Sequence, residues 1–224
     1  HGGYVFQIIG DAFCAAFSMA TDGLAAALAA QRALRDATWG ETGPILVRMA
    51  LHTGAAEVRV GEHTSGEYVS GLTLSRAARL LSAGHGGQIL LSLPTTELVR
   101  DHLTPGIILH DLDAHRLKDL IRPEHIYQVV APDLRSEFQP LKTLDTHPNN
   151  LPVQLTNFIG REQEMARVKE ILNGTRLITL TGSGGGGKTR LAIQVAADLI
   201  DEFPDGVWFV EFASLADPLL VPLT

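Results

Sequence analysis

A run of glycines late in the chain ends in a lysine and a threonine, and these residue types suit phosphate chemistry. Residues Gly182–Thr189 read GSGGGGKT and satisfy the spacing G-x-x-x-x-G-K-[ST]. Glycines let backbone N–H groups converge on phosphate oxygens, because no Cβ atom stands in the way. Lys188 supplies a mobile positive charge, and Thr189 supplies a hydroxyl ligand for Mg²⁺. The motif predicts a site for a nucleoside triphosphate with magnesium, formed by Gly182, Ser183, Gly184, Gly185, Gly186, Gly187, Lys188 and Thr189.

The segments around this loop are those that such a loop requires. Leu177–Thr181 is rich in β-branched residues and predicts a strand before it, and Val207–Phe212 predicts a second, buried strand. Between them, Lys188–Phe203 predicts a helix whose positive N-terminus faces the bound anion. Upstream, Arg161–Leu172 predicts an amphipathic helix with one apolar side formed by Met165, Val168, Ile171 and Leu172. This order is the start of an α/β domain, although four consecutive glycines predict a loop that binds more weakly.

Residues 1–131 have a mixed α+β order instead. Two short β-prone runs flank a turn with Asp11 at its tip, and an alanine-rich helix follows. The helix predicted over Leu72–Leu81 carries Arg76 and Arg79 on one face, and we expect Arg76 to be solvated. Prolines and asparagines then interrupt all periodicity over residues 132–152. We therefore predict a domain over 1–131, a linker over 132–152 and a second domain over 153–224.

Composition excludes several classes of protein. The chain has 224 residues, of which 45% are hydrophobic and 19% charged, as in a globular protein, and its net charge of −7 argues against a nucleic-acid surface. No apolar run is long enough to cross a bilayer, and the one cysteine, Cys14, excludes an internal disulfide. We expect a cytoplasmic location, with neither membrane nor nucleic acid bound by these residues. Because the chain starts at His1 and stops just after an apolar stretch, we expect a fragment.

Five segments of residues 1–131 resemble, in order, the later part of a class III adenylate or guanylate cyclase domain. They are Phe6–Ala12, Arg48–Gly54, Ser75–Arg79, His85–Ser92 and Leu117–Pro123. The resemblance implies a cyclase-like (ferredoxin-like) α+β fold. It also implies a partner for this domain, either a second copy or another domain of the same protein.

The resemblance assigns cyclase roles to several residues and shows that others are substituted. Asp11 matches one of two metal-binding carboxylates, and Arg79 matches the residue that stabilises charge on the phosphates. Three positions depart from the pattern: Gln7 replaces a base-reading lysine, Ser75 replaces an asparagine, and the purine-reading position falls at Tyr68 or Glu67. Each lost transition-state contact costs on the order of a hundredfold in rate. An inactive regulatory module is the leading interpretation, and an active cyclase is the alternative.

The last part of the chain resembles the start of a STAND (NB-ARC-like) P-loop ATPase of large bacterial LuxR-type and AfsR-type regulators. The matching segments are Leu155–Glu162, the glycine loop and Gly206–Glu211. The resemblance implies that Ile159 and Arg161 lie beside the adenine, so that the ligand is ATP or ADP with Mg²⁺. The family's acidic strand lies beyond Thr224, and we interpret Glu211 as a solvated strand-end residue. Binding is therefore predicted, and hydrolysis is not assigned to these residues.

Together these observations predict part of a multidomain signalling protein in which an ATP-dependent switch adjoins a cyclase-like module. An active cyclase under control of the second domain is one alternative. An ATP-dependent transcriptional regulator, with its DNA-binding part outside this sequence, is another. The histidines His110 and His115 near Asp111 and Asp113 do not favour a zinc site, because no cysteine accompanies them.

Overall fold

The computed structural model describes residues 1–61, 64–69, 71–118, 120, 122–152, 158 and 160–213, with only the backbone for those between 57 and 70. The chain forms two compact units. The first comprises His1–Leu117 with Arg122–Thr143, and the second comprises Lys118–Ile121 with Leu144–Thr224. The first unit thus ends at Thr143, within the segment predicted as a linker. Of the helices described, none is both long and apolar enough to span a membrane.

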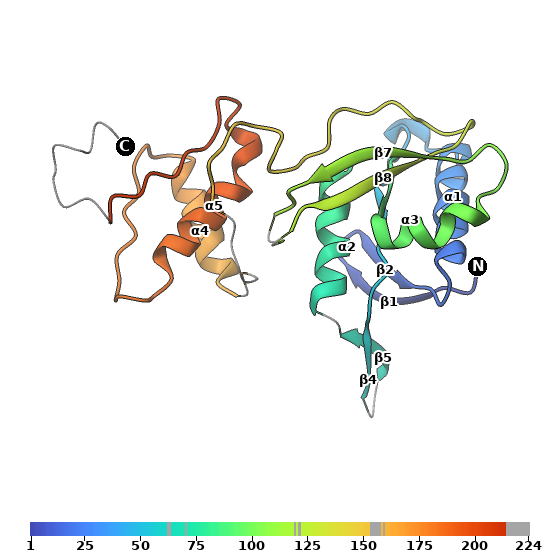
Figure 1. Ribbon diagram of the computed structural model, residues 1–224, viewed down its shortest axis with the longest axis horizontal. Helices are drawn as coiled ribbons and strands as arrows, with labels where there is room; N and C mark the ends of the chain where they lie inside the picture. Colours follow the sequence, from blue (N-terminus) through green and yellow to red (C-terminus); the bar gives the residue numbers. More distant parts are fainter. Residues whose placement is uncertain are drawn as a thin grey trace. The chain divides into compact units, whose positions relative to one another are not determined.

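The first unit mixes helices and strands along the chain, as its sequence predicts (Figure 1). Its strands are β1 (Tyr4–Ile9), β2 (Ala12–Ala16), β3 (Met49–Leu51), β4 (Glu57–Gly61), β5 (Thr64–Val69), β6 (Ile89–Ser92), β7 (Ile108–His115) and β8 (Glu124–Val130). Its helices are α1 (Ala20–Asp36), α2 (Gly71–Ala83) and α3 (Leu93–Val99), with short 3-10 turns at Gly40–Thr42 and Arg100–His102.

A four-stranded mixed sheet, in the order β3-β6-β8-β7, forms the centre of this unit. β3 and β6 run parallel, whereas β8 runs antiparallel to both β6 and β7. Two further antiparallel pairs, β1 with β2 and β4 with β5, form separate two-stranded ribbons. Since β3 and β6 are parallel neighbours, the residues that follow them lie side by side at the same end of the sheet.

The core of the first unit lies on both faces of the central strand β6, whose four residues are all buried. On one face, Ile89 and Leu91 pack with Leu24 and Leu28 of α1 and with Val99 of α3. A continuous run of apolar residues in β6 is the pattern expected for a strand covered on both sides. Contacts join both α2 and α3 to this strand.

A segment without regular structure continues from β8 and is tied to the rest of the first unit. Near its start, the Asp133 carboxylate accepts hydrogen bonds from Arg32 (2.8 and 3.1 Å) and from Arg35 (3.0 Å) of α1. Near its end, the Lys142 amide donates to the carbonyl of Ala83, the last residue of α2, at 2.9 Å. Residues 132–143 are thus a strap across this unit, with Leu141 and Thr143 buried.

The second unit is built on two helices, α4 (Glu162–Leu172) and α5 (Lys188–Asp198), with a 3-10 turn at Ile200–Glu202. Leu191, Val195 and Leu199 form its core, and Met165, Val168 and Leu172 of α4 pack against them. The prediction of an apolar side on α4 is therefore correct for these three residues. It is wrong for Ile171, which is 40% exposed, because the contact follows the spacing 165, 168, 172 around the helix.

The two strands predicted beside the glycine loop are not formed. Leu177–Thr181 and Val207–Phe212 have irregular backbone, apart from one isolated parallel bridge between Val207 and Asn149. A strand requires partners for its N–H and C=O groups, and a β-prone composition does not supply them. Both segments line an apolar pocket of about 490 Å³ beside α4 and α5, and Leu177 and Trp208 are 82% and 62% exposed. The predicted helix over Lys188–Phe203 ends its regular part at Asp198.

Candidate functional site

The glycine loop predicted to bind phosphate leads directly into α5, whose first residue is Lys188. Three of its glycines, Gly182, Gly185 and Gly187, have φ angles of 153°, 74° and 70°. L-amino acids with a side chain rarely adopt this region, so the backbone uses the freedom of glycine at these three positions. The whole stretch from Gly182 to Gly187 is exposed, which leaves its backbone open to a ligand.

Lys188 folds back over the loop that precedes it. Its ammonium nitrogen Nζ donates hydrogen bonds to the carbonyl oxygens of Gly182 (3.0 Å) and Ser183 (2.7 Å). The amide of Gly186 donates to the same Ser183 carbonyl at 3.3 Å, which closes a turn within the loop. The cation thus lies at the N-terminal end of α5, beside the first residues of the motif. Thr189, the predicted magnesium ligand, is exposed on the first turn of α5.

Arg161, which the resemblance places beside the adenine, contacts the loop itself. Its Nη1 donates to the carbonyl oxygen of Gly186 at 2.9 Å, and its Nε donates to Oε1 of Glu164 at 2.9 Å. Phe158, three residues earlier, packs against the core of the second unit, and the Arg190 guanidinium lies 5.7 Å from its ring centroid. Ile159 is outside the described residues. Sequence reasoning missed Glu164, although its i, i+3 spacing from Arg161 is a recognised signal for a helical ion pair.

The predicted cyclase residues lie on two elements of the first unit. Asp11 is exposed at the turn between β1 and β2, and Gln7 is exposed on β1, where it pairs in register with Cys14. Ser75 and Arg79 lie on α2, one helical turn apart and half-buried. The Tyr68 and Glu67 positions fall on β5, where side chains are outside the described part.

Arg76 is not simply solvated, contrary to the prediction. Its Nε lies 3.2 Å from Oε1 of Glu124, the first residue of β8, and the Glu124 side chain is only 13% exposed. Burial raises the pKa of Glu124, and the positive charge of Arg76 partly opposes this rise. The prediction missed this pair because nothing in the local sequence places β8 against α2.

His52 is part of a chain of hydroxyl contacts where the parallel strands β3 and β6 end. Its Nδ1 lies 2.8 Å from the Ser92 hydroxyl, which lies 3.2 Å from the Thr95 hydroxyl. The Thr95 hydroxyl in turn lies 3.0 Å from that of Thr53. Burial lowers the pKa of His52, and the charge of Arg76 lowers it further. Because Ser92 is 2% exposed, this network fixes two strand ends and does not present a nucleophile to a substrate.

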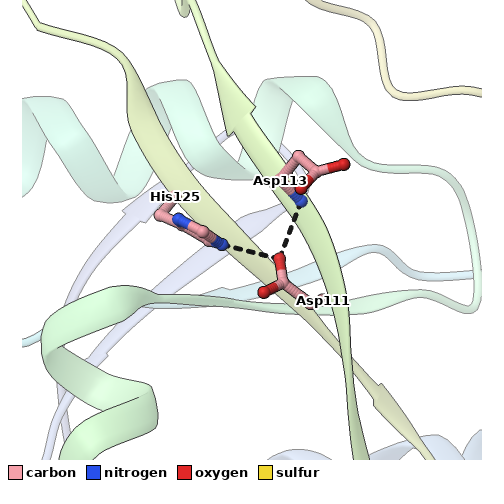
Figure 2. Close-up of side chains that lie close together, drawn as sticks. All are labelled: Asp111, Asp113 and His125. Carbon is pink, nitrogen blue, oxygen red and sulfur yellow. Dashed lines mark hydrogen bonds and ion pairs between the residues drawn. The ribbon is translucent and has the colours of Figure 1, made fainter.

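Two aspartates and a histidine on β7 and β8 lie close enough together to share an ion (Figure 2). Their ligand atoms, from Asp111, Asp113 and His125, all lie within 4.8 Å of one another. Oδ1 of Asp111 accepts the Asp113 amide at 2.8 Å and faces Nε2 of His125 at 2.6 Å. The Asp113 amide, followed by His125, lowers the pKa of Asp111. These contacts satisfy the carboxylate within the protein and stabilise the register shift between Asp111 and Ala114.

His125, which the local sequence does not single out, is therefore a partner of Asp111. His110 and His115 were considered from the sequence and did not favour a zinc site; Nε2 of His115 lies 2.7 Å from the Leu112 carbonyl. His125 reaches Asp111 through the pairing of β7 with β8, in which Asp111 stands opposite Tyr127.

Known proteins resemble this chain in sequence and in fold, although no protein-family model matches it. The uncharacterized protein Rv0891c of Mycobacterium tuberculosis is 40% identical over 169 residues, which are 74% of this chain and 55% of that protein. The chain thus spans about half the length of the relatives of this kind that it matches. A receptor-type adenylate cyclase of Trypanosoma brucei brucei is 35% identical over 96 residues, 40% of this chain and 16% of that protein.

A solved structure of an adenylate cyclase from Trypanosoma brucei in its monomeric state has a similar fold. The TM-score is 0.54 at 21% identity, and the match covers 63% of this chain and 76% of that chain. At this identity the likeness concerns the fold alone. The predicted α+β cyclase-like fold is confirmed: this chain contains the fold of an adenylate cyclase domain.

Proposed function

We propose that this chain binds ATP or ADP with Mg²⁺ at Gly182–Thr189 and belongs to a signalling protein in which the cyclase-like unit is a regulatory module. The observation that carries the proposal is the position of Lys188, whose ammonium lies over the carbonyls of Gly182 and Ser183. The resemblance of the second unit to STAND ATPases supports adenine as the base.

The loop has the chemical groups that a triphosphate needs. An ammonium has three N–H donors, and two neutral carbonyls now accept from that of Lys188. Phosphate oxygens are charged acceptors and form stronger hydrogen bonds, so they would draw this ammonium away from the carbonyls. The N-terminus of α5 adds the partial positive charge of its dipole at the same place. These features favour an anion with several phosphates.

Magnesium fits the same site. The Thr189 hydroxyl is exposed on the first turn of α5, one residue after Lys188. Mg²⁺ keeps most of its water and takes one or two protein oxygens, so a single hydroxyl is a sufficient protein contribution. When bound, the ion would neutralise charge on the phosphate oxygens. The role of Thr189 is to fix that ion relative to the loop.

Calorimetric titration of the chain with ATP and Mg²⁺ tests the proposal. We expect Lys188→Ala to weaken binding about tenfold to hundredfold, the effect of losing one charge-assisted contact. Lys142→Ala is the matched control, because Lys142 is exposed on the strap and the substitution keeps its backbone amide, which donates to the Ala83 carbonyl. Unchanged affinity in Lys188→Ala, or no binding by the wild-type chain, would refute the assignment.

Inactivity of the cyclase-like unit is part of the proposal. Gln7 presents a neutral amide where the resemblance expects a cation, and Ser75 is shorter than the expected asparagine. Each missing contact lowers the reaction rate on the order of a hundredfold, because the transition state is stabilised less. In this interpretation the unit keeps its fold and acts through association with a partner.

Adenylate cyclase activity is the second candidate, because one observation favours it. A relative with 35% identity over 96 residues is named a receptor-type adenylate cyclase, and Asp11 and Arg79 both match the cyclase pattern. Incubation with ATP and Mn²⁺, followed by chromatography for cyclic AMP, separates the candidates. Product that disappears in Asp11→Asn would establish the cyclase, and absence of product would support the regulatory module.

Self-association through the cyclase-like unit is also proposed, with a second copy as the partner. Large apolar side chains are exposed on the ribbon of β1 and β2: Ile8 is 61%, Ile9 is 58% and Phe13 is 72% exposed. Exposed apolar side chains grouped in this way commonly mark an interface. Light scattering should show a dimer that Phe13→Ser weakens, and a monomer at all concentrations would contradict this part. We also propose that the protein is cytoplasmic and has a role in the regulation of transcription.

A further inference from the structure

We propose that Arg161 and Glu164 brace the phosphate-binding loop, so that Arg161 serves the phosphate end of the nucleotide by positioning the loop and not by contacting the base. This inference rests on the proposed function. The brace consists of two contacts: Arg161 Nη1 to the Gly186 carbonyl, and Arg161 Nε to the Glu164 carboxylate, both at 2.9 Å.

A loop of this composition needs an external support. Gly184 to Gly187 carry no side chains, and glycine loses more conformational entropy on ordering than any other residue. The contacts of Lys188 hold Gly182 and Ser183, which are the first residues of the motif. Arg161 holds Gly186, near the other end. Lys188 therefore holds the first part of the loop, and Arg161 holds its last part.

The contact at Gly186 also orients the next amide. The Gly186 carbonyl and the Gly187 N–H belong to one planar peptide group and point in opposite directions. By holding the carbonyl toward Arg161, the brace directs the Gly187 N–H away from Arg161. This amide lies at the N-terminus of α5, where N–H groups without helical partners bind anions. Arg161 thus acts on the ligand through the backbone.

The loop can be approached this closely because residue 187 is glycine. A Cβ atom placed at Gly187 would lie 3.3 Å from Nη1 of Arg161, which is closer than most Cβ contacts. Arg161 itself is held in place from α4. It occupies the N-cap position of that helix with a φ of 65°, and Glu164 lies in the first turn. Since α4 packs against α5, the support and the loop belong to one small body.

The contact of Arg161 with the Gly186 carbonyl persists when a phosphate binds. The hydrogen bonds of Lys188 do not, because its ammonium must leave the carbonyls of Gly182 and Ser183 to reach the phosphate. The loop would lose both contacts of Lys188 at the moment of binding. The Arg161 contact is made to a carbonyl on the opposite side of its peptide from the anion-facing N–H, so it can persist in the bound state. The brace therefore keeps part of the loop ordered through binding, which lowers the entropy that the ligand must offset.

The test is a titration of the chain with two ligands, ATP with Mg²⁺ and inorganic tripolyphosphate with Mg²⁺. We expect Arg161→Ala to weaken both by the same factor, about tenfold, and Glu164→Ala to weaken both by about threefold. The double variant should bind no more weakly than Arg161→Ala, because both residues act through one contact. Arg167→Ala, on an exposed position of α4, is the control and should bind like the wild type.

Two further measurements separate the outcomes. Circular dichroism and thermal melting establish that each variant is folded, and amide hydrogen exchange in Gly182–Gly187 should be faster in ligand-free Arg161→Ala than in Arg167→Ala. Weaker binding of ATP with unchanged binding of tripolyphosphate would assign Arg161 to the base and overturn the brace. Unchanged affinity for both ligands would overturn it as well. Failure of the wild-type chain to bind either ligand would instead remove the proposed function on which the inference depends.

Discussion

Replacement of Gly187 by alanine tests whether the loop conformation of the free chain is the one that binds nucleotide. Gly187 has a φ of 70°, and an L-residue in this region costs about 1–2 kcal/mol. The exposed loop of the variant can relieve this strain when no ligand is present, so the cost appears on binding. We therefore expect Gly187→Ala to bind ATP about fivefold to thirtyfold more weakly than the wild type.

Gly174→Ala is the control for this substitution. Gly174 lies outside the loop and outside the positive-φ set, and a Cβ atom there would meet only the Ile171 carbonyl oxygen, at 4.0 Å. Calorimetric titration with ATP and Mg²⁺ should therefore give a wild-type affinity for Gly174→Ala, and melting curves should show that both variants are folded. If Gly187→Ala binds as tightly as Gly174→Ala, the left-handed conformation at residue 187 is not required in the complex and the reasoning fails.

The remaining predictions concern the first unit. Leu90→Ala, at a position with 0% exposure in the central strand, should lower the free energy of unfolding by about 2–5 kcal/mol in urea titrations; a smaller loss would mean that β6 is not central to the core. Because the pKa of His52 is lowered in the folded chain, His52 is protonated in the unfolded chain at a higher pH than in the folded chain, beginning near pH 6.5. The stabilisation from neutral His52 is complete above 6.5 and decreases below it, so the difference in melting temperature between wild type and His52→Gln should shrink from pH 7.5 to 5.5; a constant difference would contradict this.

The features that could be predicted from the sequence are those encoded within a few residues. The spacing of Gly182 to Thr189 predicted a loop that leads into a helix, and α5 does begin at Lys188. The i, i+3, i+4 pattern predicted α4 with its contacts through Met165, Val168 and Leu172. The turn at Asp11 follows from Gly10-Asp11 between two β-prone runs.

The features that were missed depend on contacts between residues far apart in the sequence. His125 reaches Asp111 only through the register of β7 and β8, and Glu124 reaches Arg76 only because β8 adjoins α2. Leu177–Thr181 has a strand composition, but a strand needs a neighbour, and composition does not provide one. The contact of Arg161 with Gly186 spans 25 residues, and the local sequence does not indicate it.

The strap over residues 132–143 joins the C-terminal end of α2 to the central sheet. The Lys142 amide donates to the Ala83 carbonyl at the end of α2, the helix that carries Ser75 and Arg79. The same strap contacts the sheet, because Gln128 of β8 donates to the Ser136 carbonyl at 2.7 Å and the Thr143 hydroxyl lies 3.5 Å from Nδ1 of His115 on β7. A displacement of the strap therefore acts on α2 and on two strands of the central sheet together.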